Sequence, residues 1–244
     1  KCYSLVSVNA IPFPTTRRSV IVALASDDAT ERTRALDTLV ALYWRPLYKY
    51  ARVAWSRLAE DAEDLTQSFF TRVVEKDSLA SYDAAKASFR TFLRLLFDRH
   101  ISNEKKSGER LKRGGGEVHL DFDAAEAELG RESSHSESPE EYFRREWVRS
   151  VFALAVERLR EWCDAGGKDV HFRLFEAYDL DEDRTISYRE LGSRFGLTET
   201  TVTNYLAATR RELRRIVLDT LREVTASDQE FRSEARSLLG VDPK

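Results

Sequence analysis

The stretch YRELGSRFGLTETTVTNYLA, Tyr188–Ala207, decides the fold class of this chain. Apolar residues recur in it at helical spacing on both sides of a glycine. They are Leu191, Phe195, Leu197, Val202 and Leu206. Gly196 can adopt the positive φ of a tight turn, and Gly192 is small enough for two helices to approach closely. Thr198 is a suitable N-cap for the second helix. The pattern predicts a helix-turn-helix.

The second helix of this unit carries side chains suited to DNA. Hydroxyl and amide groups can hydrogen bond to base edges, and guanidinium groups can neutralise phosphates. The candidate DNA-binding residues are Thr198, Thr200, Thr201, Thr203, Asn204, Arg210, Arg211 and Arg214. An ordinary helical hairpin with a glycine turn is the alternative. The simultaneous fit of core, turn and cap positions favours DNA binding over it.

The composition agrees with a helical, soluble protein. Apolar residues make up 42% and charged residues 33% of the 244, which is unlike a disordered chain. Only 10 glycines and 5 prolines are present, too few for the many turns of an all-β fold. The two cysteines, Cys2 and Cys163, cannot form a disulfide framework, so we expect a cytoplasmic protein. No apolar stretch is long enough to predict a membrane span.

The formal net charge of −3 does not by itself indicate a nucleic-acid partner, but the charges are unevenly distributed. Basic residues are dense over 86–113 and again over 210–215, while acidic residues fill 121–141 between them. The basic segments are therefore the places where we expect phosphate contacts.

Apolar periodicity and helix caps predict an all-α fold of two small helical domains joined by a flexible acidic linker. The expected helices are Asp27–Trp55, as one or two helices interrupted at Trp44-Arg45-Pro46, and then Glu60–Glu75, Ser88–Lys106, Pro139–Cys163, Val170–Tyr178, Ser187–Phe195 and Glu199–Val224. A loop is expected at Asp77–Ala87, and a short helix inside the linker at about Asp123–Leu129. The expected divisions are an N-terminal tail, 1–26, a first domain, 27–107, a linker, 108–138, a helix-turn-helix domain, 139–226, and a C-terminal helical extension, 227–244.

The C-terminal extension begins with a capping-box signature, Ser227 followed three residues later by Glu230. Gly240 is expected to end its amphipathic helix. We expect this helix to pack on the second domain or to meet a regulator.

Three segments together resemble the sigma-70 family of bacterial RNA polymerase sigma factors, of the extracytoplasmic-function (ECF) type. The segment DAEDLTQ, Asp61–Gln67, followed by Phe69-Phe70, resembles the family's region 2.2. YDAAKASFRTFL, Tyr82–Leu93, resembles the loop and helix that open and read the −10 promoter element. The helix-turn-helix falls where region 4.2 reads the −35 element. The run KRGGG at 112–116 resembles one subgroup of these factors.

The resemblance implies a transcription initiation factor rather than an enzyme, with no cofactor. Its partners would be promoter DNA and core RNA polymerase, contacted at the β′ clamp and the β flap. The positions matching the clamp-binding motif are Asp61, Glu63, Asp64 and Gln67. Those matching the −10-reading region are Tyr82, Lys86, Arg90, Thr91, Arg94, Asn103, Lys105 and Lys106. The resemblance also implies that the activity of the protein is restrained, either by an anti-sigma factor, by a regulatory kinase or by an appended tail.

Some positions depart from the family's pattern. Thr203, Tyr205 and Ala208 stand where the family often has Lys or Arg, which leaves the affinity for a −35 element open. The approach to the helix-turn-helix, Glu161–Thr185, is also longer than usual.

Two other functions remain open. A helix-turn-helix regulator that does not bind polymerase would account for Tyr188–Arg214 but not for Asp61–Gln67. A calcium-binding loop of the EF-hand kind is suggested by oxygen-bearing residues at its ligand spacing: Asp179, Asp181, Asp183, Thr185, Ser187 and Glu190. Arg184 stands where that loop needs glycine. The four histidines lack metal-ligand spacing, so no metal enzyme is expected.

Overall fold

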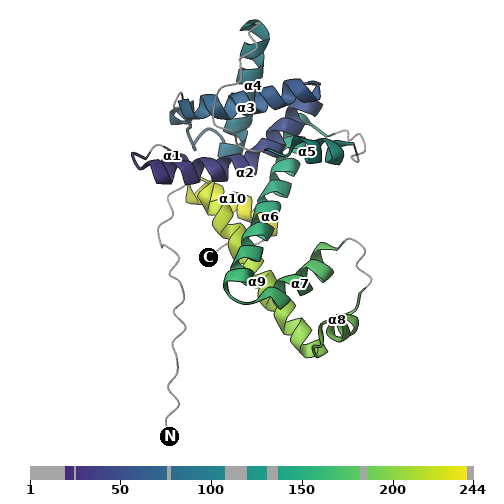
Figure 1. Cartoon of the computed structure of the whole chain (residues 1–244). Coiled ribbons are helices and arrows are strands. Elements are labelled where there is room, and N and C mark those ends of the chain that lie inside the picture. Colours follow the sequence, from purple (N-terminus) through teal and green to yellow (C-terminus); the bar gives the residue numbers. More distant parts are fainter. Residues whose placement is uncertain are drawn as a thin grey trace.

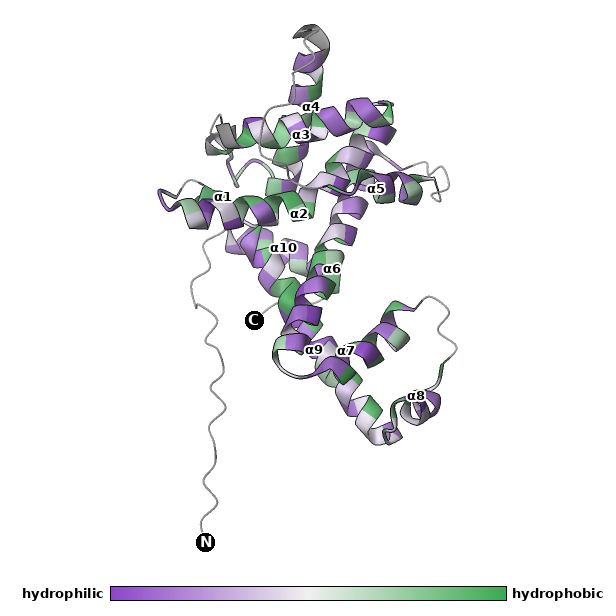
Figure 2. Cartoon of the chain, in the orientation of Figure 1, coloured by the Kyte–Doolittle hydropathy of each residue, from purple (hydrophilic) through white to green (hydrophobic). Residues whose placement is uncertain are grey.

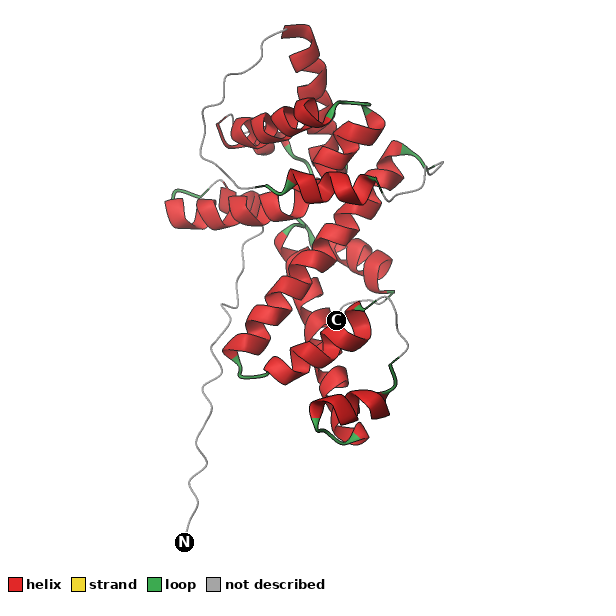
Figure 3. Cartoon of the chain, turned by 45° about the vertical axis from the view of Figure 1, so that its right-hand side comes forward, coloured by secondary structure: helices red, strands yellow, loops and turns green. Residues whose placement is uncertain are grey.

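The computed structural model describes residues 20–24, 26–75, 78–107, 120–130, 137–181 and 186–240. Every secondary-structure element among these residues is helical, and no strand occurs within them (Figure 3). The all-α fold class predicted from the sequence is therefore confirmed. No helix in these ranges combines the length and the apolar character that crossing a membrane requires.

The first group of helices is built around one long helix. The elements are α1 (Val20–Leu24), α2 (Ala29–Ala54), α3 (Ala59–Glu75), the 3₁₀ turn η1 (Ser78–Ser81) and α4 (Phe89–Ser107). Asp28 caps α2 by accepting hydrogen bonds from the amides of Thr30 and Glu31. Buried residues from α2, α3 and α4, among them Leu39, Phe69 and Phe97, join one apolar core.

The predicted interruption of the first helix at Trp44-Arg45-Pro46 is wrong. Helix α2 runs unbroken for 26 residues with Pro46 inside it. Proline removes one helical hydrogen bond, which disfavours a helix interior. Leu42 and Leu47, on either side of it, are fully buried. Their packing in the core stabilises the helix on both sides of Pro46 and offsets the lost hydrogen bond.

The short helix expected inside the linker is confirmed as α5 (Phe122–Leu129). The ring of Phe122 lies 5.5 Å from that of Trp44 and 5.0 Å from that of Tyr48, both on α2. The carboxylate of Glu126 accepts a hydrogen bond of 2.6 Å from the Tyr48 hydroxyl. The Arg52 guanidinium beside Glu126 lowers the pKa of that carboxyl. Residues 120–130 therefore pack against α2 through aromatic and ionic contacts.

Helix α6 (Pro139–Ala165) joins the two halves of the chain (Figure 1). Ser138 and Glu141 form a full capping box at its start. Its Trp147 is buried and lies 6.4 Å from Tyr43 of α2, measured between ring centroids. Further along α6, Arg158 forms an ion pair of 2.9 Å with Glu223 of α9. Because α6 packs against α2 and also against α9, a division into separate domains is not shown.

The last elements surround the helix-turn-helix. They are α7 (Asp169–Phe175), the π-helical turn η2 (Glu176–Leu180), α8 (Tyr188–Phe195), α9 (Glu199–Glu223) and α10 (Asp228–Leu239). Figure 1 shows α7 and α8 beside one end of α9, whereas α10 returns toward α2. Hydrophilic and hydrophobic residues alternate along these helices (Figure 2), as expected for helices that each bury one face.

Candidate nucleic-acid and polymerase interfaces

The helix-turn-helix has the geometry that its sequence predicts. Gly196 has a φ of 68°, the left-handed value that favours glycine at the end of α8. A Cβ on Gly192 would lie 2.7 Å from the carbonyl oxygen of Leu197, so only glycine fits at this crossing. Thr198 caps α9 by accepting a hydrogen bond of 3.2 Å from the amide of Thr201. The turn and both helix ends are thus determined by local residues.

The candidate DNA-binding residues of α9 lie mostly at the surface. Thr201 is half-buried and hydrogen bonds to the Thr198 hydroxyl. The others are exposed: Thr198, Thr200, Thr203, Asn204, Arg210, Arg211 and Arg214. Hydroxyls, one amide and three guanidinium groups therefore lie along the exposed side of one helix, and that set of donors can contact base edges and phosphates.

One of these arginines is already paired inside the protein. The guanidinium of Arg210 donates hydrogen bonds to both carboxylate oxygens of Asp179, with the closest contact at 2.9 Å. It also donates to the Tyr188 hydroxyl at 3.3 Å. The Asp179 carboxylate raises the pKa of Arg210. Any phosphate contact by Arg210 must therefore compete with Asp179.

Residues matching the −10-reading region gather where α4 begins. The Tyr82 ring packs against Phe89 and Phe92, with ring centroids 5.3 Å and 5.1 Å away. The Thr91 hydroxyl lies 3.4 Å from Glu140 of α6. Arg94 pairs with Asp98 at 2.8 Å and lies 3.7 Å from Glu140.

The remaining positions of this set are more scattered. Lys86 is exposed and pairs with Asp83 at 3.1 Å. Asn103 is exposed farther along α4. Lys105 and Lys106 belong to the end of α4, but their side chains lie outside the described residues. Tyr82, Arg90 and Thr91 form the compact part of the set. We call these three residues, together with the neighbouring Phe89 amide, the α4 entrance.

Helix α10 lies on the α4 entrance. Glu230 accepts hydrogen bonds from the Phe89 amide at 2.6 Å and from the Tyr82 hydroxyl at 3.2 Å. Glu234 accepts one from Arg90 at 2.9 Å. Burial, reinforced by Glu230, raises the pKa of Tyr82. The helix expected to pack on the second domain thus contacts α9 and also covers part of the first group of helices.

Two carboxylates and an amide lie in a row along α3. Asp61, Asp64 and Gln67 are exposed and recur at three-residue spacing, which places them on one face of the helix. We call these three residues the acidic row. Glu63, in contrast, is half-buried. The structure therefore brings together three of the four residues predicted to bind polymerase.

Sequence reasoning missed Leu58 at the end of this row. Its carbonyl accepts the Ala62 amide, and its side chain is 72% exposed. An apolar side chain this exposed beside acids is suited to a protein partner. A leucine immediately before a helix gives no such signal in sequence, because most leucines are buried.

The carboxylates of the possible calcium loop have other partners. Asp179 binds Arg210, and Glu190 accepts hydrogen bonds from the amide and hydroxyl of Ser187 in a capping box. Asp181 is exposed, while Asp183 and Thr185 lie outside the described residues. Among the residues that are described, no three carboxylate, histidine or cysteine side chains form a metal-binding group.

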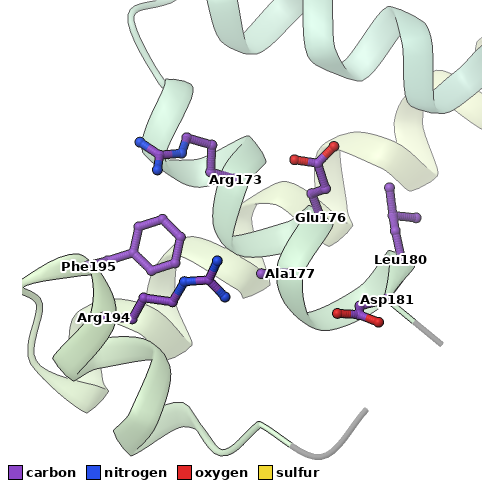
Figure 4. A pocket seen from close by; sticks show the side chains of 7 residues that line it. All are labelled: Arg173, Glu176, Ala177, Leu180, Asp181, Arg194 and Phe195. Carbon is purple, nitrogen blue, oxygen red and sulfur yellow. The ribbon is translucent and has the colours of Figure 1, made fainter. Parts of the chain in front are cut away.

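A hollow of about 510 Å³ lies between η2 and α8 (Figure 4). Arg173 and Arg194 lie by the ring of Phe195 on one wall, with guanidinium-to-centroid distances of 5.2 Å and 5.8 Å. Glu176 and Asp181 line the other wall. None of the candidate DNA-binding residues lines this hollow, so it is separate from the exposed face of α9.

Comparison with protein-family models, with curated proteins and with solved structures finds no match for this chain.

Proposed function

We propose that this chain is a transcription initiation factor of the ECF sigma type, which binds core RNA polymerase and directs it to promoter −10 and −35 elements. The observation that carries the proposal is the presence, in one chain whose described elements are all helical, of a capped helix-turn-helix and a separate exposed acidic row on α3. A regulator that binds DNA alone has no need of the acidic row.

Each surface has its own role in the proposal. Asp61, Asp64 and Gln67, with Leu58 beside them, dock on the polymerase clamp. The exposed face of α9 contacts the −35 element, and its arginines release counterions from phosphates. The Tyr82 ring of the α4 entrance stacks on an unpaired base of a melted −10 element. The factor contributes binding free energy that favours the open promoter, and polymerase performs the chemistry.

The proposal also requires two separately placed units. Residues 27–107 and 139–226 would contact promoter elements that lie apart on DNA, with 108–138 setting their separation. The contacts of α6 with α2 would then be broken when polymerase binds. The closed arrangement is the state of the free chain in this proposal.

The first test is binding of the full chain to bacterial core RNA polymerase, followed by fluorescence anisotropy of a labelled protein. We expect tight binding that weakens about tenfold or more in Asp61→Ala/Asp64→Ala, since charged pairs at interfaces contribute on this scale. The matched control is Asp37→Ala/Glu161→Ala, which removes two exposed carboxylates away from α3. The control should bind as the wild type does.

Failure to bind core polymerase, combined with binding to DNA, would replace this proposal with that of a helix-turn-helix regulator. Equal weakening by both double variants would show that net charge, rather than the acidic row, governs docking.

A further inference from the structure

We infer that α10 is a built-in competitor for promoter DNA, holding the α4 entrance closed with Glu230 and Glu234 until nucleic acid or polymerase displaces it. This inference rests on the proposed function, because it assigns a regulation to the −10-reading surface.

Glu230 departs from the role that its sequence position predicts. Among the described helices, α6, α8 and α10 begin after a serine that is followed three residues later by glutamate. At Ser138 and Ser187 the glutamate returns to the N-cap amide and completes a capping box. In α10, Ser227 accepts the Glu230 amide at 3.2 Å, but the Glu230 carboxylate does not complete the box. It binds the amides of Ala226 and Phe89 and the Tyr82 hydroxyl.

Glu234 pairs with the arginine that we assign to −10 contacts. Arg90 and Glu234 are nearly covered, with side chains 11% and 9% exposed. The Arg90 guanidinium also lies over the Trp147 ring of α6, 5.1 Å from its centroid. A nucleic-acid strand cannot reach Arg90 in this arrangement, because contacts with α10 and α6 leave its side chain only 11% exposed. DNA must therefore displace α10 before Arg90 can take part in binding.

The remaining contacts of α10 suit reversible docking. Phe231 and Ala235 are buried, and Arg222 of α9 lies over the Phe231 ring at 4.2 Å. A helix of 12 residues is only marginally stable on its own, so α10 depends on this packing. Its release from the α4 entrance does not require any other helix to unfold. The short connection from α9 to α10, Val224–Ser227, keeps α10 close after release. The competition is therefore intramolecular, with a high effective concentration of the two carboxylates.

The test uses the full chain and the variant Glu230→Gln/Glu234→Gln. Glutamine retains the size of glutamate and its ability to support a helix start, so α10 still forms. The matched control is Asp37→Asn/Glu161→Gln, which makes the same change in net charge at exposed positions outside α10. The probe is a fluorescein-labelled single-stranded DNA of mixed sequence, and the readout is anisotropy. Each protein is also titrated with core RNA polymerase.

We expect the glutamine variant to bind the DNA about tenfold more tightly than the wild type, and the control to stay within about twofold, because only the first removes a competing state. Equal gains in both variants would overturn the inference, since the effect would be one of net charge. If the wild type bound both DNA and polymerase and the glutamine variant bound DNA no more tightly, this inference would be overturned. The proposed function would still stand. If no form of the chain bound either partner, the proposed function would fall as well.

Hydrogen exchange gives an independent measurement of displacement. We expect saturating single-stranded DNA to raise deuterium uptake in the wild-type peptide covering 228–239, as α10 leaves the α4 entrance. Unchanged uptake with DNA bound would contradict the inference. A chain ending at Ala226 should bind the DNA at least as tightly as the glutamine variant, with its remaining helices checked by circular dichroism.

Discussion

His100 is a buried titratable residue between α3 and α4. One ring nitrogen lies 2.9 Å from the Ser68 hydroxyl and the other 3.3 Å from the Arg72 guanidinium. Burial, with the Arg72 charge adding to it, lowers the pKa of His100 to about 4. The histidine is therefore neutral in the folded protein at neutral pH and serves the packing of the first group of helices.

This burial predicts a pH-dependent stability. Between the unfolded pKa of 6.5 and the folded pKa of about 4, the unfolded chain binds more protons than the folded one. Stability therefore falls as the pH drops through that window, in total by on the order of 3 kcal/mol from this residue. Urea unfolding at pH 7.5 and 4.5 should show a smaller pH difference for His100→Gln than for the wild type. An equal difference in both proteins would contradict the assignment.

The contact between helices α2 and α6 contains a buried ion pair. The ammonium of Lys49 lies 2.7 Å from Glu146 and 2.7 Å from Glu128, and the side chains of Lys49 and Glu146 are 1% and 3% exposed. Arg149 also contacts Glu146, at 2.6 Å. Burying charges is costly, so each depends on its partner.

Removing one partner of this pair should be more harmful than removing both. We expect Glu146→Gln to lower the free energy of unfolding by about 3 kcal/mol, since it leaves the Lys49 ammonium with one carboxylate. Adding Lys49→Met to it should recover more than about 1 kcal/mol, because the buried ammonium, then paired only with the half-exposed Glu128, is removed. Urea unfolding of the four proteins of this cycle measures the coupling. Additive effects would show that the two side chains do not interact in solution.

At the scale of the whole molecule, α6 connects every other group of helices. It contacts α2 through Trp147 and α9 through Arg158, while α10 closes the structure from α9 back to α4. A chain connected in this way is expected to unfold as one cooperative unit when no partner is bound.

We therefore predict one unfolding transition in urea, with coincident midpoints by circular dichroism at 222 nm and by tryptophan fluorescence. The fluorescence reports on α2 through Trp44 and on α6 through Trp147 and Trp162. Two separated transitions would instead indicate that 27–107 and 139–226 fold independently even in the free chain.

The sequence by itself determined the features that depend on neighbours along the chain. The helix-turn-helix is one: Gly192, Gly196 and Thr198 act on the next few residues, and their turn and cap chemistry is visible in sequence. Most helix ends follow from caps for the same reason, and helical periodicity predicted most of the exposed face of α9.

Only the tertiary structure decided the features that join distant residues. It keeps α2 continuous through Pro46, buries Lys49 against Glu146, turns Glu63 of the acidic motif partly inward and brings α10 over the α4 entrance. The pairs Lys49–Glu146 and Arg90–Glu234 are separated by 97 and 144 positions. No local pattern encodes such pairings, because a charged residue looks the same in sequence whether it faces water or a partner from another helix.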